Sequence, residues 1–199
     1  MEHKVPIILS TRNPSKAEQI RALFGDVPLF VRTLSEMGIE GEAVEDGLSL
    51  EENAVKKARF ALRPGHLAMA DDTGLFIDAL GGRPGVHAAR WAGDVSTEEI
   101  TQYTLRQLEG VWDRGATFKT VVALVSPDGK ERYFSGEVRG VILDAPRVPP
   151  QPKMPYSPIF VPEGSDKVWA EMTTEEENAI SHRGKAFRLV RDYLLSGNF

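Results

Sequence analysis

Short apolar runs alternate with helix-start signals along the first third of this chain, and this alternation limits the folds open to it. The runs Val5–Leu9 and Leu67–Ala70 are bounded by polar residues and predict buried strands. Between them, Asn13-Pro14 combines a helix cap with a proline at the first helical position. Ser49 to Glu52 fits a capping box that opens a second helix. Helices interleaved with strands predict an α/β fold with a mixed, twisted sheet.

The same signals predict the remaining elements. The predicted helices run from Pro14 to about Phe24, from residue 50 to about Leu62, from a capping box at Ser96–Glu99 to about Trp112, and from Thr174 to about Leu195. The other predicted strands are Leu29–Leu34, Phe118–Val125 and Arg132–Leu143, the last two joined by a hairpin turn at Ser126–Lys130. Seven prolines between Pro146 and Pro162 exclude a central strand or a helix there. With no repeat and no linker, residues 1–199 are expected to form one domain of two lobes.

Composition excludes several classes of function. The 199 residues contain 24 Lys plus Arg, 29 Asp plus Glu and no cysteine, for a net charge of −5. The absence of cysteine excludes a disulfide scaffold, a cysteine metal site and thiol catalysis. The acidic balance argues against a broad nucleic-acid or anionic-membrane surface. No apolar run approaches the ~18 residues of a membrane span, and the N-terminal sequence lacks signal-peptide features, so we expect a cytoplasmic protein.

The turn after the first predicted strand carries a candidate phosphate site at Ser10–Lys16. A strand-to-helix turn presents free backbone N–H groups at the positive end of the helix dipole. Thr11 and Asn13 add hydrogen-bonding groups, and Lys16 adds a full charge. The alternative is an ordinary helix cap with a solvated lysine.

The second predicted helix begins with Glu51-Glu52-Asn53 and continues to Lys56-Lys57. Glu52 is a candidate oxygen ligand for Mg²⁺, and Lys57 is a candidate phosphate contact. The alternatives are a surface ion pair between Glu52 and Lys56, or a capping role for Glu52 towards Ser49.

Asp71 and Asp72 directly follow a predicted buried strand. Adjacent carboxylates are costly there unless something compensates them, and a divalent cation does so. A carboxylate in this place can hold a metal and also take a proton from an attacking water. The alternative is an Asp turn that uses Gly74 for positive φ.

Ser181-His182-Arg183 lies inside the last predicted helix. The two basic side chains are either donors to the oxygen atoms of a ligand or a solvated pair on the helix surface.

Taken together, these motifs resemble the inosine triphosphate pyrophosphatase (ITPase) family, the XTP/dITP diphosphatases of the Maf/ITPase superfamily. Residues 10–16 resemble its Thr-x-Asn-x-x-Lys motif, and Glu52 to Ala58 resembles its Glu-Asn-Ala-x-x-Lys-Ala helix. The further matching segments, in order, are Asp71–Leu75, Asp78–Val86, Ala89–Gly93, Pro158–Pro162 and Asn178–Arg183. Several motifs in register over nearly the whole chain make the resemblance specific.

The resemblance implies an enzyme that hydrolyses ITP, dITP and XTP to the monophosphate and pyrophosphate and so cleans the nucleotide pool. It further implies Mg²⁺ as the cofactor, a homodimer, and a mixed sheet between two lobes with a central nucleotide cleft. Asp72 would be the general base, and Glu52, Asp72 and Asp71 the metal ligands. The substrate-binding residues that it implies are Thr11, Arg12, Asn13, Pro14, Ser15, Lys16, Lys57, Thr73, Met154, Pro155, Tyr156, Ser157, Glu177, His182 and Arg183.

This chain departs from the family pattern in two segments near the base. The Phe-Gly-Tyr-Asp-Pro segment of the family reads Met154-Pro155-Tyr156-Ser157-Pro158, and its Lys before Asn-x-x-Ser-His-Arg is Glu177. We therefore expect hydrolysis to survive with a relaxed or shifted base preference. Either Met154 still packs on the ring of the base, or Tyr156 substitutes for the stacking aromatic. The alternatives are a pyrophosphatase for other modified bases and a nucleotide-binding protein without catalysis. A nucleic-acid-binding module is disfavoured because the chain has no basic stripe.

Overall fold

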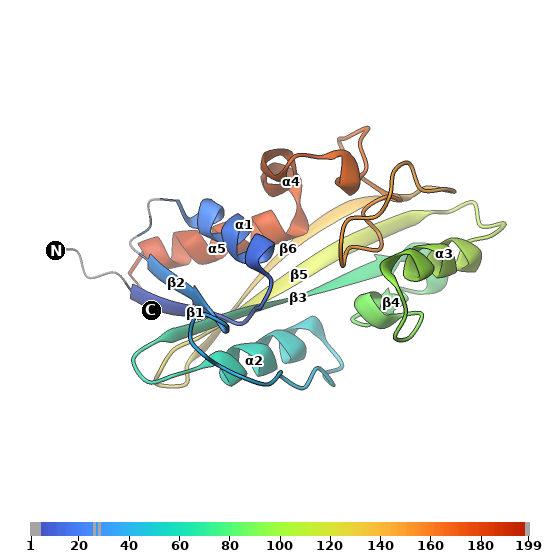
Figure 1. Ribbon diagram of the computed structural model, residues 1–199. Helices are drawn as coiled ribbons and strands as arrows, with labels where there is room; N and C mark the ends of the chain where they lie inside the picture. The colour runs from blue at the N-terminus through green and yellow to red at the C-terminus, as the bar shows by residue number, and fades with distance from the viewer. Residues whose placement is uncertain (1–4, 26, 28, 198–199) are drawn as a thin grey trace. The chain divides into compact units, whose positions relative to one another are not determined.

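The computed structural model describes residues 5–25, 27 and 29–197 (Figure 1). The strands are β1 (Val5–Leu9), β2 (Leu29–Thr33), β3 (Leu67–Ile77), β4 (Pro84–Gly85), β5 (Gly115–Val125), β6 (Glu131–Ile142) and β7 (Phe160–Pro162). The α-helices are α1 (Pro14–Phe24), α2 (Leu50–Ala61), α3 (Thr97–Gln107), α4 (Thr174–Ile180) and α5 (His182–Leu195). Short 3-10 turns cover Asp78–Leu80, Ala88–Arg90 and Trp169–Glu171.

Both parallel and antiparallel pairing occur, which confirms the prediction of a mixed α/β fold. β1 pairs in parallel with β2 and with β3, whereas β4 on β3 and β7 on β6 are antiparallel. The hydrogen-bonded order is β2-β1-β3-β5-β6-β7. The chain divides into two compact units. Unit 1 comprises the described residues up to 72, with 120–136 and those from 183 on, and unit 2 comprises residues 73–119 and 137–182.

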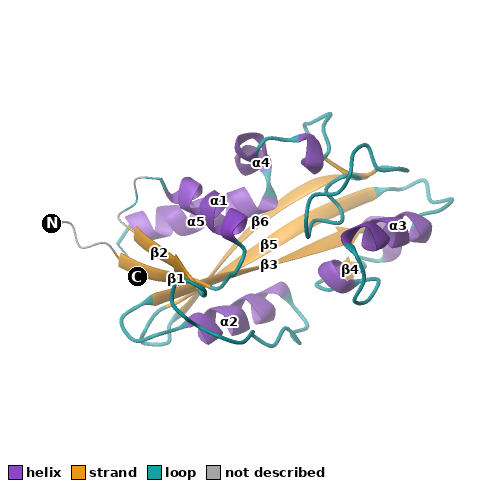
Figure 2. Cartoon of the chain, in the orientation of Figure 1, coloured by secondary structure: helices purple, strands orange, loops and turns teal. Residues whose placement is uncertain are grey.

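Unit 1 has helices on both faces of its strands, with α1 and α5 on one face and α2 on the other (Figure 2). Alternation along the strands explains this arrangement, because successive side chains point to opposite faces. Leu67 and Met69 of β3 join the cluster built with Ile20 of α1 and Phe187 of α5. Ala68, between them, joins the second cluster, which includes residues of α2 and the segment before it.

Unit 2 has a core rich in aromatic side chains. Phe118 of β5 packs against Tyr156 and Phe160 at centroid distances of 5.9 and 4.8 Å, and Phe160 stacks on Trp169 at 5.8 Å. Aromatic rings supply large buried area with few rotatable bonds. They fix the proline-rich segment, which reaches the sheet only as the three-residue edge strand β7. The prediction that this segment forms no central strand is confirmed.

The strand that contains the two aspartates is longer than predicted. β3 does not end at Ala70 but continues through Asp71 and Asp72 to Ile77. The alternative of an Asp turn is therefore wrong, and Gly74 is an ordinary strand residue with no positive φ. A Cβ at Gly74 would lie 2.8 Å from the carbonyl oxygen of Gly85, so close pairing with β4 is the reason for this glycine.

Two helices are shorter than predicted. α3 ends at Gln107, and a turn with Gly110 at φ 73° follows, so Trp112 lies outside the helix. The last predicted helix is two helices, because Ser181 between α4 and α5 is extended, with φ −66° and ψ 154°. An extended serine is typical of the residue that precedes a helix, and His182 and Arg183 accordingly open α5 instead of lying inside a longer helix.

The two predicted capping boxes differ. At Ser96 and Glu99 both reciprocal hydrogen bonds are present, which confirms the prediction. At α2 the Ser49 hydroxyl accepts from the Glu52 N–H, but the Glu52 carboxylate accepts from the N–H of Leu48 and not of Ser49. Across the described residues, every helix is too short or too polar to cross a membrane.

Candidate functional site

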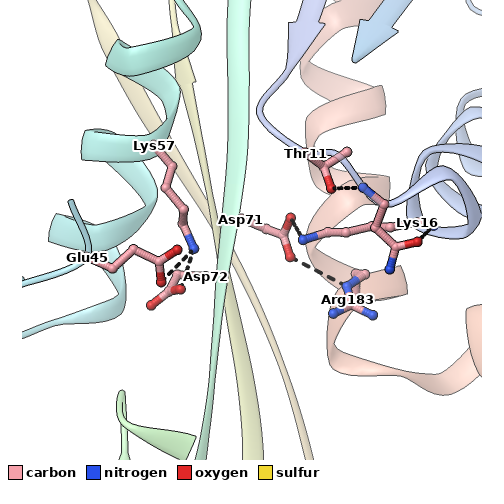
Figure 3. Close-up of polar contacts among 8 residues, drawn as sticks. Thr11, Lys16, Glu45, Lys57, Asp71, Asp72 and Arg183 are labelled. Carbon is pink, nitrogen blue, oxygen red and sulfur yellow. Dashed lines mark hydrogen bonds and ion pairs between the residues drawn. The ribbon is translucent and has the colours of Figure 1, made fainter. Parts of the chain in front are cut away.

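Asp71 and Asp72 are neighbours on β3, yet their carboxylates point to opposite faces of the strand (Figure 3). The parity of the strand explains this, since Asp71 follows Leu67 and Met69 on the face of α1 and α5. Asp72 follows Ala68 on the face of α2. Unit 1 therefore contains two separate carboxylate–cation clusters.

The Asp71 cluster joins β3 to α1 and α5. Lys16 Nζ lies 2.5 Å from Asp71 Oδ1, and Arg183 Nε lies 3.5 Å from Oδ2. The Asp71 side chain is 3 % exposed. Burial acts to raise its pKa, but Lys16, Arg183 and Lys57 outweigh this and hold the pKa of Asp71 well below its usual range. Burial lowers the pKa of Lys16, partly offset by Asp71. Asp71 is thus an ionised carboxylate that orders two cations.

The Asp72 cluster joins β3 to α2 and the segment before it. Lys57 Nζ lies 2.5 Å from Asp72 Oδ1, and Asn53 Nδ2 donates to Asp72 Oδ2 at 3.3 Å. Glu45 Oε2 lies 3.7 Å from the same Lys57 nitrogen. Burial raises the pKa of Asp72, against the opposing effect of Lys57 and Asn53, and Glu45 raises it further. A buried carboxylate with a raised pKa is a better proton acceptor than an exposed one.

The turn before α1 is built as a helix start. The Thr11 hydroxyl accepts from the Asn13 N–H at 3.1 Å, and Asn13 Oδ1 accepts from the Lys16 N–H at 3.4 Å. Pro14 is the first residue of α1, and the side chain of Ser15 lies outside the described part of the chain. Thr11 and Asn13 therefore cap the helix, while the Lys16 ammonium is paired with Asp71 and is not simply solvated.

Arg12 points away from this helix start. Its Nη2 donates to the backbone carbonyls of Ile39 and Gly41, at 2.6 Å each. The guanidinium therefore ties the segment that leads to Glu45 to the turn before α1.

Two of the sequence-predicted residues of unit 2, Tyr156 and His182, pack against Phe118 in its aromatic core. His182 is 6 % exposed and stacks on Phe118 at a centroid distance of 5.0 Å, so the alternative of a solvated His-Arg pair is wrong. The Tyr156 ring is buried and its hydroxyl donates to the Ala88 carbonyl at 2.8 Å. Thr73 in β3 and Glu177 in α4 are both partly exposed.

The loop with the altered family segment is held by its own hydrogen bonds. The Ser157 hydroxyl accepts from the Gln151 N–H at 2.9 Å and donates to the Met154 carbonyl at 2.7 Å. The Pro155 carbonyl accepts from the Thr101 hydroxyl at 2.5 Å. Ser157 is therefore a turn-forming residue, and Met154 is partly exposed whereas residues 155–158 are buried.

Glu45 belongs to the Asp72 cluster and was not predicted from the sequence. Its carboxylate shares the Lys57 ammonium with Asp72, whereas Lys56 pairs with Asp46 at 2.7 Å and not with Glu52. The available signal was the acidic pair before Gly47, directly ahead of the α2 cap. Within the part of the chain that the structure describes, no three Asp, Glu or His side chains gather as a ready metal site.

Comparison with known proteins agrees with these motifs. The model of the Ham1 family matches residues 7–193. The chain belongs to the Ham1 family, and its resemblance to the ITPase family is thereby confirmed. It is 42 % identical over 195 residues to the dITP/XTP pyrophosphatase of Caldanaerobacter subterraneus subsp. tengcongensis, covering 95 % of this chain and 96 % of that one. It is 41 % identical over 192 residues to the dITP/XTP pyrophosphatase of Geobacter sulfurreducens, covering 94 % and 96 %.

Solved structures show the same fold. A HAM1 protein from Coxiella burnetii superposes with a TM-score of 0.86 at 33 % identity, covering 96 % of this chain and 99 % of that one. The Ham1 protein of Staphylococcus aureus gives 0.84 at 32 % identity, covering 97 % and 100 %.

Proposed function

We propose that this protein is a nucleoside triphosphate pyrophosphatase that hydrolyses dITP, ITP and XTP to the monophosphate and pyrophosphate. The names of its relatives support the reaction class. The observation that carries the proposal is the buried Asp72, which has a raised pKa and lies against Lys57, within the same unit as the Lys16 and Arg183 cations. A proton acceptor and several fixed cations are what hydrolysis of a triphosphate needs.

The residues fit Mg²⁺ as the cofactor. The carboxylates of Asp72 and Glu45 converge on one positive charge, the Lys57 ammonium. Mg²⁺ prefers such hard oxygen ligands and is usually bound through one or two carboxylates plus substrate phosphates. Asp72 and Glu45, with the predicted ligand Glu52, would hold it, and the role of Asp71 as a further ligand stays a prediction. When bound, Mg²⁺ supplies charge neutralisation on the triphosphate and activation of the attacking water.

The chain's own groups divide the remaining work. Asp72 takes the proton of the water that attacks the α-phosphorus, and pyrophosphate leaves. Lys16, Lys57 and Asn13 bind phosphate oxygens, and Asp71 keeps Lys16 extended towards β3. Thr73 donates a hydrogen bond to the substrate. The charge and the donor capacity of each side chain support these roles.

Base recognition is assigned to His182 and Arg183 as donors to a 6-oxo group. Adenine carries an amine at that position, so a buried donor would be left without an acceptor. Because Met154, Ser157 and Glu177 replace the family residues, we propose a relaxed or shifted base preference. The burial of Tyr156 and its hydrogen bond to Ala88 make Met154 the candidate contact to the base. We further propose a homodimer in the cytoplasm.

The test is pyrophosphate release from ITP, XTP, dITP, dUTP, GTP and ATP with Mg²⁺, by the wild-type protein and Asp72→Asn. Release by the wild type that the substitution abolishes supports a pyrophosphatase with Asp72 as the base. Nucleotide binding without release identifies a non-catalytic binding protein, and near-full turnover by Asp72→Asn refutes the assignment of the base. Strong selectivity for ITP, dITP and XTP over dUTP, GTP and ATP would overturn the shifted base preference.

A further inference from the structure

Asn53 is the buried polar residue of α2 that faces Asp72. Only 1 % of its surface is exposed to solvent. The amide nitrogen Nδ2 donates to Asp72 Oδ2 at 3.3 Å, and the amide oxygen Oδ1 accepts from the backbone N–H of Gly47 at 2.8 Å. One side chain therefore links the carboxylate on β3 to the segment that precedes α2.

The chemistry of these two contacts selects an amide. Gly47 offers a donor and the ionised Asp72 offers an acceptor, so the linking group must accept on one atom and donate on another. At this size only asparagine does both. Aspartate keeps the acceptor but loses the donor, and leucine has neither.

The segment before α2 approaches Asn53 too closely for a side chain at residue 47. A Cβ built on Gly47 would lie 2.6 Å from Asn53 Oδ1 and 2.8 Å from the Cβ of Glu52. Real Cβ contacts do not come this close, so glycine is required for packing, although its φ is not positive. Gly47 is two residues after Glu45, so fixing its backbone limits where the Glu45 carboxylate can lie.

The same segment is anchored at its other end. Arg12 binds the carbonyls of Ile39 and Gly41, and between Gly41 and Gly47 the chain has no helix or strand. Glu45 is thus carried by an irregular segment fixed by Arg12 before it and by Asn53 after it.

We infer that Asn53 is a positioning residue that orients the Asp72 carboxylate and fixes Glu45 beside it through Gly47. The catalytic part of this inference rests on the proposed function. Groups that orient ligands or bases in this way typically change activity by about 10- to 100-fold when removed. The effect is expected on kcat more than on KM, since Asn53 is buried and its side chain is bonded to Asp72 and Gly47.

The first experiment measures the link without activity. Amide hydrogen exchange of Gly47 is followed by NMR in the wild type, Asn53→Asp and Asn53→Leu. Asn53→Asp keeps an oxygen that accepts from Gly47, so its protection is expected to persist, whereas Asn53→Leu is expected to lose it by about tenfold or more. Unchanged protection in Asn53→Leu would overturn the coupling. Because the reaction is not involved, this result stands whether or not the protein releases pyrophosphate.

The second experiment measures kcat and KM for dITP with Val55→Ala as the matched control. Val55 is buried on the same helix and has no part in the hydrogen bonds to Gly47 or Asp72, so this variant reports destabilisation of α2 alone. We expect a loss of kcat of about 10-fold or more in Asn53→Asp, with Val55→Ala near the wild type. Equal kcat values in Asn53→Asp and Val55→Ala would refute the positioning role.

If Asn53→Leu does not fold, Asn53→Asp and Gly47→Ala decide the question, since we expect a reduced kcat in both. If the wild type itself releases no pyrophosphate, the proposed function fails and the exchange result alone decides the link to Gly47.

Discussion

Asp71 and Asp72 are consecutive residues, yet Lys16 of α1 pairs with the first and Lys57 of α2 with the second, each at 2.5 Å. The two carboxylates therefore have different electrostatic surroundings. Burial raises the pKa of Asp72. The pKa of Asp71, in contrast, is held well below its usual range by the cations that surround Asp71. This difference supports the proposed role of Asp72 as the proton acceptor and keeps Asp71, on the other face of β3, ionised at neutral pH.

Removing the Lys57 charge is expected to change the pH dependence of the reaction. Lys57 lowers the pKa of Asp72, so Lys57→Met raises that pKa. A general base must be deprotonated, and the acid limb of the kcat/KM profile should move to higher pH by about one unit. The matched control is Lys56→Met, because Lys56 pairs with the exposed Asp46. A shift of equal size in both variants would contradict this assignment.

Asp71→Asn is expected to change the acid dependence of stability. The pKa of Asp71 is lowered in the folded state, so its contribution to the free energy of unfolding is present above pH 4 and is lost as the pH falls towards the folded-state pKa. The variant should be less stable than the wild type at pH 7, and the two should converge below pH 4. The slope of this difference cannot exceed about 1.4 kcal/mol per pH unit for one proton. Urea unfolding at several pH values measures it, and a difference that stays constant down to pH 3 or widens would refute the ion pair.

Glu45→Gln is expected to weaken the response to Mg²⁺. Glu45 is the second carboxylate on the Lys57 ammonium, and neutralising it removes one oxygen charge from the proposed metal site. The Mg²⁺ concentration for half-maximal activity should rise by about tenfold. Asp46→Asn removes the neighbouring charge, which faces Lys56, and should leave that concentration unchanged. Mn²⁺ binding followed by electron paramagnetic resonance gives the same comparison without turnover.

Glu177→Lys is expected to sharpen the base preference. The family carries a lysine here, and in this chain the charge has the opposite sign on a partly exposed position of α4. Restoring the positive charge should raise the ratio of kcat/KM for XTP over ATP by about tenfold, because a cation favours the additional oxygen of xanthine. Glu175→Lys makes the same charge change on an exposed neighbour in the first turn of the helix. An equal ratio in both variants would show that net charge alone is responsible.

Much of the fold was predictable because its signals are local. A few neighbouring residues are enough to recognise each of these signals: Pro14 at the first position of α1, the caps at Ser49 and Ser96, and the apolar run of β1. The length of β3 was not predictable, because two adjacent charged residues normally end a buried strand. Their compensation comes from Lys16, Lys57 and Arg183, which are distant in sequence.

The candidate site divides in the same way. Spacing alone left ordinary alternatives open for the charged residues of the motifs, and the family resemblance singled them out. The structure brings Lys57 to Asp72 and Lys16 to Asp71. Glu45 was missed because it lies in an irregular segment with no periodicity, held by Arg12 and Asn53 from other parts of the chain. The break at Ser181 was missed because the apolar residues of α4 and α5 have the spacing of one continuous helix. Serine is nevertheless a signal for a helix start.

The alternation along β3 also restricts how sequences of this kind can change length. Deleting one residue between Leu67 and Asp71 would turn both carboxylates to the other face, so that Asp71 would meet α2 and Asp72 would meet Lys16. Deleting two would restore the faces but shift the pair by one repeat along β1, which contacts β3 at Leu67 through Met69. Insertions and deletions should therefore be tolerated in the turn before Leu67 and excluded from the five residues that follow it.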